Sequence, residues 1–431
     1  MSSAEPYRFW WRSYDGEKPR TAGWHAIGAA GFREREERIT GHQYLDAAAP
    51  DWADDLLRLA RAAFLADKLA SREKVLDRWT RRFSLSLPVS DPLRWTGTSA
   101  GLASALLQML TGDHWDIRPR ALRAASSQPP IPLGDDWRAT EVALFSGGLD
   151  SLSWAAQRAG APAGLLLLVT FAEPQLESLQ HGVLQTVEKL ARDSGRVIKH
   201  ANLRQVPGGR DGRSVETSSR SRGLLYSATA VRAAAASNIP VVYVPENGQL
   251  ALNPPLTAAR SSALSTRSVH PWTLHLLNRL IRSISGAEGT VTVTNPLAHL
   301  TKGEVCKAAV HAGGLLPADL EATLSCGAPP RRRQNRPHDN CGVCYPCLVR
   351  RSGLLYANGA DATDYEASPT SPRLPRKRTR DFHALRRWLE TPYGPLDLIA
   401  DQPLPPGTEA APWLDVIDRG RTELRALVRA M

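Results

Sequence analysis

From residue 140 onward, short apolar runs alternate regularly with longer amphipathic segments. The runs predict strands at Val142–Phe145, Leu165–Phe171, Val197–Leu203, Val241–Val244 and Val291–Thr294. The amphipathic segments predict helices at Leu149–Arg158, Leu176–Arg192, Gly223–Ala236, Pro271–Ile284 and Glu304–Ala312. Thr301 and Glu304 form a capping box for the last helix. Because strands joined by helices run parallel, we predict an α/β fold with a doubly wound parallel sheet.

The preceding residues are patterned differently. Asp51 can cap a helix over Asp54–Leu69, and Phe83–Val89 alternates with serine and proline as a strand with one buried face would. A helix near Leu102–Leu110 and a short strand at Trp115–Ile117 follow. We therefore predict an N-terminal α+β domain.

Composition changes suggest the boundaries of the parts. They are the N-terminal domain (1–124), a linker (125–137), the main domain (138–365), and an arginine-rich linker with C-terminal helices (366–431). The last helix, over Trp413–Met431, is amphipathic, and we expect its apolar face to pack into the core.

The strongest chemical signal lies where the first strand of the alternating region ends. An apolar strand runs into Ser146-Gly147-Gly148-Leu149-Asp150-Ser151, and a helix begins at once. Glycines let the backbone approach an anion, and the helix N-terminus favours negative charge. Both serines can donate hydrogen bonds to phosphate oxygens. This turn is therefore a candidate nucleotide phosphate site, although it lacks the Gly-Lys-Ser/Thr ending of a Walker A loop.

Asp150 is an acidic residue within this candidate anion site. A Mg²⁺ ion carried by the nucleotide would explain a carboxylate there, and so would a contact with a backbone amide.

Four of the five cysteines lie close together in the sequence. Cys326 precedes Cys341, Cys344 and Cys347, which follow one another at the spacing of tetrahedral Zn²⁺ sites. Four thiolates leave no open coordination position, so the predicted zinc is structural. An iron–sulfur cluster is the alternative. We expect Cys306, inside a predicted helix, to lie in the core.

Charge and the N-terminus bear on partners and compartment. The net charge of +11 and isoelectric point near 9.7 favour an anionic partner, or reflect only an arginine-rich composition. The first twelve residues lack the apolar segment of a signal peptide, and Leu165–Phe171 is too short to span a bilayer. We expect a cytoplasmic protein that does not enter membranes.

The Ser-Gly-Gly-x-Asp-Ser turn resembles the signature of the PP-loop ATP pyrophosphatases, which have the adenine nucleotide α-hydrolase (HUP-like) fold. Taken with Asn295–Val305 and with Ser325-Cys326 and Cys341–Arg350, the chain resembles the 7-cyano-7-deazaguanine synthase (QueC-like) family over about residues 138–357. The resemblance implies that residues 146–151 bind ATP with Mg²⁺. It further implies that Lys302 contacts phosphate, with Asp150 and Lys302 in catalytic roles, and that the four cysteines hold structural zinc.

Three segments depart from that family's pattern. They are Phe171–Glu177, Thr217–Leu225 and Pro245–Pro254, where the family has residues that contact its substrate. The family also lacks an N-terminal domain of this size. These departures resemble the longer QueC-like proteins of bacterial anti-phage defence operons, as in the Qat system. That resemblance implies a protein partner from the same operon.

The expected reaction follows from this resemblance. A carboxylate on a 7-deazaguanine-type substrate attacks the α-phosphorus of Mg·ATP, pyrophosphate leaves, and an amine attacks the acyl-adenylate. The amine is ammonia, giving an amide and then a nitrile, or a protein amine, giving a conjugate.

Four further residues are candidate substrate contacts. Arg220 and Arg222 precede a helix in a loop that could close over phosphates, although ordinary solvated arginines would look the same. Glu246 and Asn247 follow a strand at its carboxyl end, where open α/β sheets bind ligands.

Two alternative functions remain open from sequence. One is a PP-loop enzyme that modifies tRNA, which the basic charge favours and which salt-dependent RNA binding would support. The other is a non-catalytic nucleotide-binding scaffold subunit, because a fold does not prove turnover.

Overall fold

The computed structural model describes residues 5–19, 21–32, 44, 47–123, 134, 137–161, 164–171, 176–203, 205–207, 216–257, 267–286, 289, 291–327, 340–400 and 403–431. Most of the predicted linker at 125–137 lies outside the described residues, and so do residues 172–175 of the Phe171–Glu177 segment.

The larger sheet has five strands, all parallel, in the order β7-β6-β5-β8-β9. The strands are β5 (Glu141–Leu144), β6 (Leu165–Phe171), β7 (Val197–Leu203), β8 (Val241–Tyr243) and β9 (Thr292–Thr294). Each matches a predicted strand to within one residue at either end. The chain builds outward from β5 in one direction and then returns to build outward in the other, so the strand order reverses between β5 and β8.

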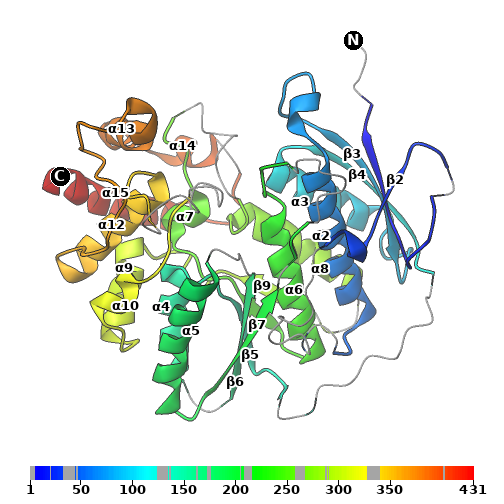
Figure 1. Cartoon of the computed structure of the whole chain (residues 1–431), viewed down its shortest axis with the longest axis horizontal. Helices are drawn as coiled ribbons and strands as arrows, with labels where there is room; N and C mark the ends of the chain where they lie inside the picture. The colour runs from blue at the N-terminus through cyan, green and yellow to red at the C-terminus, as the bar shows by residue number, and fades with distance from the viewer. Residues whose placement is uncertain are drawn as a thin grey trace.

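Helices cover both faces of this sheet, because side chains of successive strand residues point to opposite faces. Ala143 and Phe145 pack with α4 (Leu149–Ala159), α5 (Glu177–Arg192) and α9 (Lys302–His311). Val142 packs on the other face with α6 (Arg222–Ala236) and α8 (Pro271–Ser285). Figure 1 shows this layering. The α/β doubly wound fold is confirmed, as is the capping box of Thr301 and Glu304 at the start of α9.

The N-terminal part corrects the α+β expectation. Its four strands are β1 (Tyr7–Trp11), β2 (His25–Ile27), β3 (Arg82–Val89) and β4 (His114–Ala121), in the order β2-β1-β3-β4. All pairs are parallel, because helices α2 (Asp51–Leu69) and α3 (Thr98–Thr111) make the crossovers. This part is α/β like the rest. Two short 3-10 turns, Ala29–Gly31 and Arg72–Lys74, complete it.

Two local expectations in this part are also wrong. Asp51 lies inside α2, and Pro50 occupies the N-cap position. Strand β3 is buried on both faces, because Ser84 and Ser86 are covered as well as the apolar residues that alternate with them. Short hydroxyl side chains tolerate such burial, so alternation with serine does not mark a solvent-exposed face.

One hydrophobic core joins the two sheets. Helices α2 and α3 pack against α6 and α8, and residues from both sheets belong to the same buried cluster. Polar contacts reinforce this junction: Arg232 pairs with Asp54 at 2.5 Å, and the Arg94 guanidinium donates to the carbonyl of Ser285 at 3.3 Å. The predicted boundary between residues 124 and 138 therefore does not separate two independent cores.

The C-terminal helices gather beside α9, on the side of the molecule away from the N-terminal sheet (Figure 1). They are α10 (Pro317–Glu321), α12 (Tyr345–Asn358), α13 (Arg376–Glu390), α14 (Pro395–Ala400) and α15 (Ala411–Ala430). The apolar faces of α12, α13, α14 and α15 form a separate cluster with the short helix α7 (Gly248–Leu252), whereas Leu320 of α10 packs with α4, α5 and α9. As expected, Trp413, Ile417 and Leu424 of α15 lie in this core. Part of the expected arginine-rich linker is instead the first turn of α13.

Among the described residues, no helix combines the length and apolar character that crossing a membrane requires.

Candidate functional site

The Ser146–Ser151 turn lies at the carboxyl end of β5, where the strand order reverses. Open α/β sheets bind ligands at such a switch point. Gly147 adopts φ +73°, a left-handed conformation that favours glycine. A Cβ atom there would also lie 3.0 Å from Cγ of Gln180 on α5. Backbone geometry and packing therefore both require glycine at this position.

Hydrogen bonds within the turn fix its shape. The Ser146 hydroxyl accepts from the Gly148 amide at 3.2 Å and lies 3.3 Å from the Ser151 hydroxyl. Ser151 in turn donates to the Gly148 carbonyl at 2.9 Å, and Gln180 Nε2 donates to the Ser146 carbonyl at 3.2 Å. Ser146 is exposed, whereas Ser151 is buried. The turn is thus preformed, with its first hydroxyl facing solvent.

Asp150 belongs to this turn, and its side chain lies in a buried polar cluster. Its Oδ2 atom accepts from Lys302 Nζ at 2.7 Å, from the Asn247 side-chain amide at 2.8 Å and from the Asn247 backbone amide at 3.1 Å. The exposed fraction is only 5% for Asp150 and 2% for Lys302. The structure thus brings together three of the predicted site residues. It also realises the backbone-amide contact that the sequence offered as one explanation of the acid.

One oxygen of this carboxylate remains unsatisfied. Asp150 Oδ1 is buried and has no hydrogen-bond partner among the described residues. A buried acceptor without a partner costs free energy, commonly about 1–3 kcal/mol. This oxygen is therefore available to a ligand or ion that enters the site.

Glu246 completes the cluster from the end of β8. Its Oε1 atom accepts from Asn247 Nδ2 at 3.0 Å, and Asn295 holds its backbone through both amide atoms, at 2.7 and 3.1 Å. Burial and the adjacent Asp150 charge raise the pKa of Glu246 well above its usual value. The neutral form of Glu246 is therefore favoured relative to that of an exposed carboxyl.

Asp150 has the opposite character. Burial alone would raise the pKa of its carboxyl, but the charge of Lys302 and the hydrogen bonds from Lys302 and Asn247 outweigh that effect and lower it. The pKa values of the two neighbouring acids are thus shifted in opposite directions.

The two arginines stack on different aromatic rings. The Arg220 guanidinium stacks over Trp79 of the N-terminal part, 4.5 Å from the ring centroid. Burial and the nearby charges of Arg72 and Arg267 lower the pKa of Arg220 to about 10. Arg222 instead lies over Phe171, at the carboxyl end of β6, 5.9 Å from the ring centroid. The substrate roles of Arg220 and Arg222 stay predictions.

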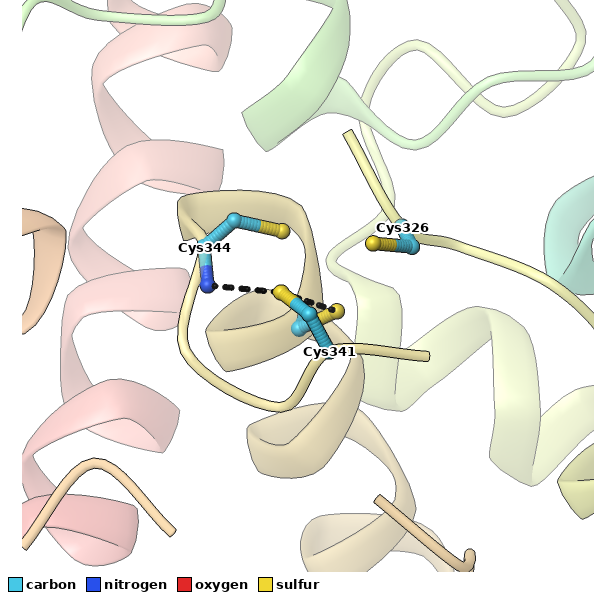
Figure 2. Close-up of side chains that lie close together, drawn as sticks. Cys326, Cys341 and Cys344 are labelled. Atoms are coloured by element: carbon cyan, nitrogen blue, oxygen red, sulfur yellow. Dashed lines mark hydrogen bonds between the residues drawn. The ribbon is translucent and has the colours of Figure 1, made fainter. Parts of the chain in front are cut away.

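The four predicted cysteine ligands converge on one point (Figure 2). The Sγ atoms of Cys326, Cys341, Cys344 and Cys347 all lie within 4.8 Å of one another, and Cys341 and Cys347 are 3.9 Å apart. A tetrahedron with Zn–S bonds of about 2.3 Å has sulfur atoms about 3.8 Å apart, so the cluster could hold zinc. Cys306 lies in the core, as expected, where burial raises the pKa of its thiol.

Backbone amides support the cluster as they do in metal–thiolate sites. The amide of Cys344 points to the Cys341 sulfur, and that of Gly327 to the Cys344 sulfur, each at 3.4 Å. Such donors stabilise thiolate charge. The segment also reaches the phosphate turn, because a Cβ atom on Gly148 would lie 3.0 Å from the Leu324 carbonyl oxygen. The cysteine cluster therefore helps to shape one wall of the turn.

Several residues of the site were not identified from sequence. Gln180, Asn295 and Gln249 each hydrogen-bond a member of the turn or its cluster, and Glu423 bonds Thr301 and Gly303, the two neighbours of Lys302. Asn295 opens one of the segments that carried the family resemblance, so its position gave a signal. The other three lie on helices with no local motif, and only the fold brings them to the site.

Comparison with known proteins supports the resemblance. Residues 272–358 match the family model described as queuosine biosynthesis protein QueC. The chain is 28% identical over 247 residues to a 7-cyano-7-deazaguanine synthase of Thiobacillus denitrificans, which covers 52% of this chain and 97% of that protein. A synthase of the same name from Novosphingobium aromaticivorans is 27% identical over 261 residues, covering 56% and 97%. No solved structure gives a significant match.

The chain is thus similar to the QueC family model over residues 272–358, and to 7-cyano-7-deazaguanine synthases over about half its length. The other half has no counterpart in these relatives.

Proposed function

We propose that this protein is an ATP-dependent synthase that activates a carboxylate on a 7-deazaguanine-type substrate. The observation that carries the proposal is the preformed Ser146–Ser151 turn at the switch point, with the Asp150–Lys302 pair buried directly beneath it at 2.7 Å. The QueC family uses ATP, and its homologues support carboxylate activation.

In this proposal the turn binds the departing pyrophosphate. The amides at the start of α4 and the exposed Ser146 hydroxyl donate to phosphate oxygens. Lys302 lies within reach of negative charge that develops on the leaving group. The unsatisfied Asp150 Oδ1 atom is a suitable ligand for Mg²⁺ that accompanies the nucleotide.

The remaining roles follow from position. Glu246 and Asn247 lie at the carboxyl end of β8, where the heterocycle would bind. The activated carboxylate then passes to an amine. Ammonia gives an amide that a second activation can dehydrate to a nitrile, whereas a protein amine gives a conjugate. We further propose the second outcome, within an anti-phage defence system, because half of the chain has no counterpart in the matched synthases.

The rival functions make different demands. A tRNA-modifying enzyme would release AMP only with RNA present, and a scaffold subunit would bind ATP without turnover.

The first experiment measures pyrophosphate and AMP release from Mg·ATP with 7-carboxy-7-deazaguanine. It is run with ammonia and then with a small protein encoded beside this one. We expect release that requires the deazaguanine. Asp150→Asn removes the charge that holds Lys302 and should lower the rate about 100-fold or more.

The matched control is Asp193→Asn, an exposed acid after α5, which should leave the rate unchanged. A mass increase on the protein partner would identify conjugation. ATP binding without release under every condition would refute carboxylate activation of this substrate.

A further inference from the structure

The C-terminal helix α15 brings a buried carboxylate to the start of α9. Glu423 is 5% exposed, and its Oε2 atom accepts from the Gly303 backbone amide at 3.1 Å. Its other oxygen accepts from the Thr301 hydroxyl, the N-cap side chain of α9. In the described part of the chain, this carboxylate thus accepts hydrogen bonds from a hydroxyl and from a peptide N–H.

These contacts belong to a complete set at the helix start. The first N–H groups of a helix have no partner within the helix. Here the amide of Lys302 donates to Gln249 Oε1 at 3.0 Å, that of Gly303 to Glu423, and that of Glu304 to the Thr301 hydroxyl at 3.1 Å. With all three amides occupied, the N-terminus of α9 offers a ligand only the Lys302 side chain.

The residues around these hydrogen bonds are closely packed. A Cβ atom on Gly303 would lie 2.6 Å from Glu423 Oε1 and 2.5 Å from a ring carbon of Tyr356. Gly420 of α15 lies so close to the Gln249 side chain that a Cβ atom there would overlap it. Helix α15 therefore supplies Glu423, which holds the Gly303 amide, and packs against Gln249, which holds the Lys302 amide.

A second contact fixes the direction of approach. Arg419, one turn before Glu423 on α15, donates to both carboxylate oxygens of Glu304 at 2.7 and 3.2 Å, and to the His299 carbonyl at 2.8 Å. Glu423 and Arg419 of α15 thus both hold the first turn of α9. A negative charge at a helix N-terminus is also favourable in itself.

We propose that Glu423 is a positioning residue for the active site: it fixes the start of α9, and thereby the Lys302 ammonium against Asp150. Helix α15 is then part of the catalytic apparatus and not only a packing element. The role assigned to Lys302 rests on the proposed function, but its placement by Glu423 does not.

The placement is tested first without any assay of activity. The rate at which an amine-reactive acylating reagent labels Lys302 is measured by mass spectrometry, with the exposed Lys307 of the same helix as internal reference. In the native protein Lys302 should react slowly. Glu423→Ala should raise its rate about tenfold relative to Lys307, because the helix start loosens.

Two further variants separate shape from charge. Glu423→Gln can still accept from Gly303 and donate to Thr301, so labelling should stay within about twofold of the native rate. Glu423→Asp shortens the side chain by one methylene and should also raise the labelling rate of Lys302. This variant replaces Glu423→Ala if the latter does not fold. The exposed Asp418→Asn, on the opposite side of α15, is the control.

Activity then gives the functional readout. Glu423→Ala should lower kcat about tenfold with KM for ATP changed less than threefold, and Glu423→Gln should restore most of kcat. Unchanged Lys302 labelling in the folded Ala and Asp variants would overturn the proposal. Changed labelling in a protein with no pyrophosphate release under any condition would support the placement while refuting the proposed function.

Discussion

At the scale of single residues, the site depends on how charge is distributed around Asp150. An acid at the start of a phosphate-binding helix is unexpected, since it would repel the ligand. The structure resolves this by pairing its charge with Lys302, while burial and the adjacent Asp150 charge raise the pKa of Glu246. Sequence suggested each of these residues separately. Their mutual contacts could not be predicted, because they come from three crossovers that meet only in the folded sheet.

Gly147 gives a prediction at this scale. Gly147→Ala places a side chain at φ +73° and against Gln180, and should destabilise the protein by about 1–2 kcal/mol while weakening ATP binding at least tenfold. Chemical denaturation and nucleotide titration measure the two effects.

The matched control is Gly182→Ala on the exposed face of α5, where a Cβ atom meets nothing within 4 Å. This change should stabilise the protein by up to about 1 kcal/mol and leave ATP binding unaltered. Equal losses in the two variants would show that the Gly147 conformation does not matter.

At the scale of elements, the alternating region was predictable and the N-terminal part was less so. Strands β5 to β9 are short apolar runs bounded by helices, a pattern with one parallel solution. In the N-terminal part, the buried serines of β3 gave the sequence pattern of a strand with one exposed face, and that pattern favoured the α+β prediction. The C-terminal helices were foreseen only in part, because the basic first turn of α13 has the composition of a linker.

The cysteine cluster gives the prediction for this scale. Four sulfurs within 4.8 Å should hold one zinc ion per chain, measured by elemental analysis of the purified protein. Cys347→Ser should lose most of the metal and destabilise the segment that touches Gly148.

Cys306→Ala removes a buried thiol outside the cluster and should retain the metal. Iron with acid-labile sulfide in place of zinc would contradict the structural-zinc assignment and support the cluster alternative.

At the scale of the whole molecule, the two sheets share one core and the C-terminal helices reach into the site. The N-terminal part also grips the segment that leads into α6: Lys68 donates to the Ser218 carbonyl at 2.7 Å, and Asp67 accepts from the Ser221 hydroxyl at 2.6 Å. Arg220 lies within that segment, and Arg222 follows it as the first residue of α6. The parts of the chain beyond the matched domain are therefore attached directly to elements that surround the phosphate turn, which sequence alone did not reveal.

The central claim is that the turn supports attack of a carboxylate on the α-phosphorus of ATP. The most direct test labels the carboxylate of 7-carboxy-7-deazaguanine with heavy oxygen and analyses the AMP by mass spectrometry. Adenylation followed by amine attack must leave one labelled oxygen on the phosphate of AMP, so we predict label there in proportion to turnover. AMP without label, or ADP and phosphate as the products, would contradict the account.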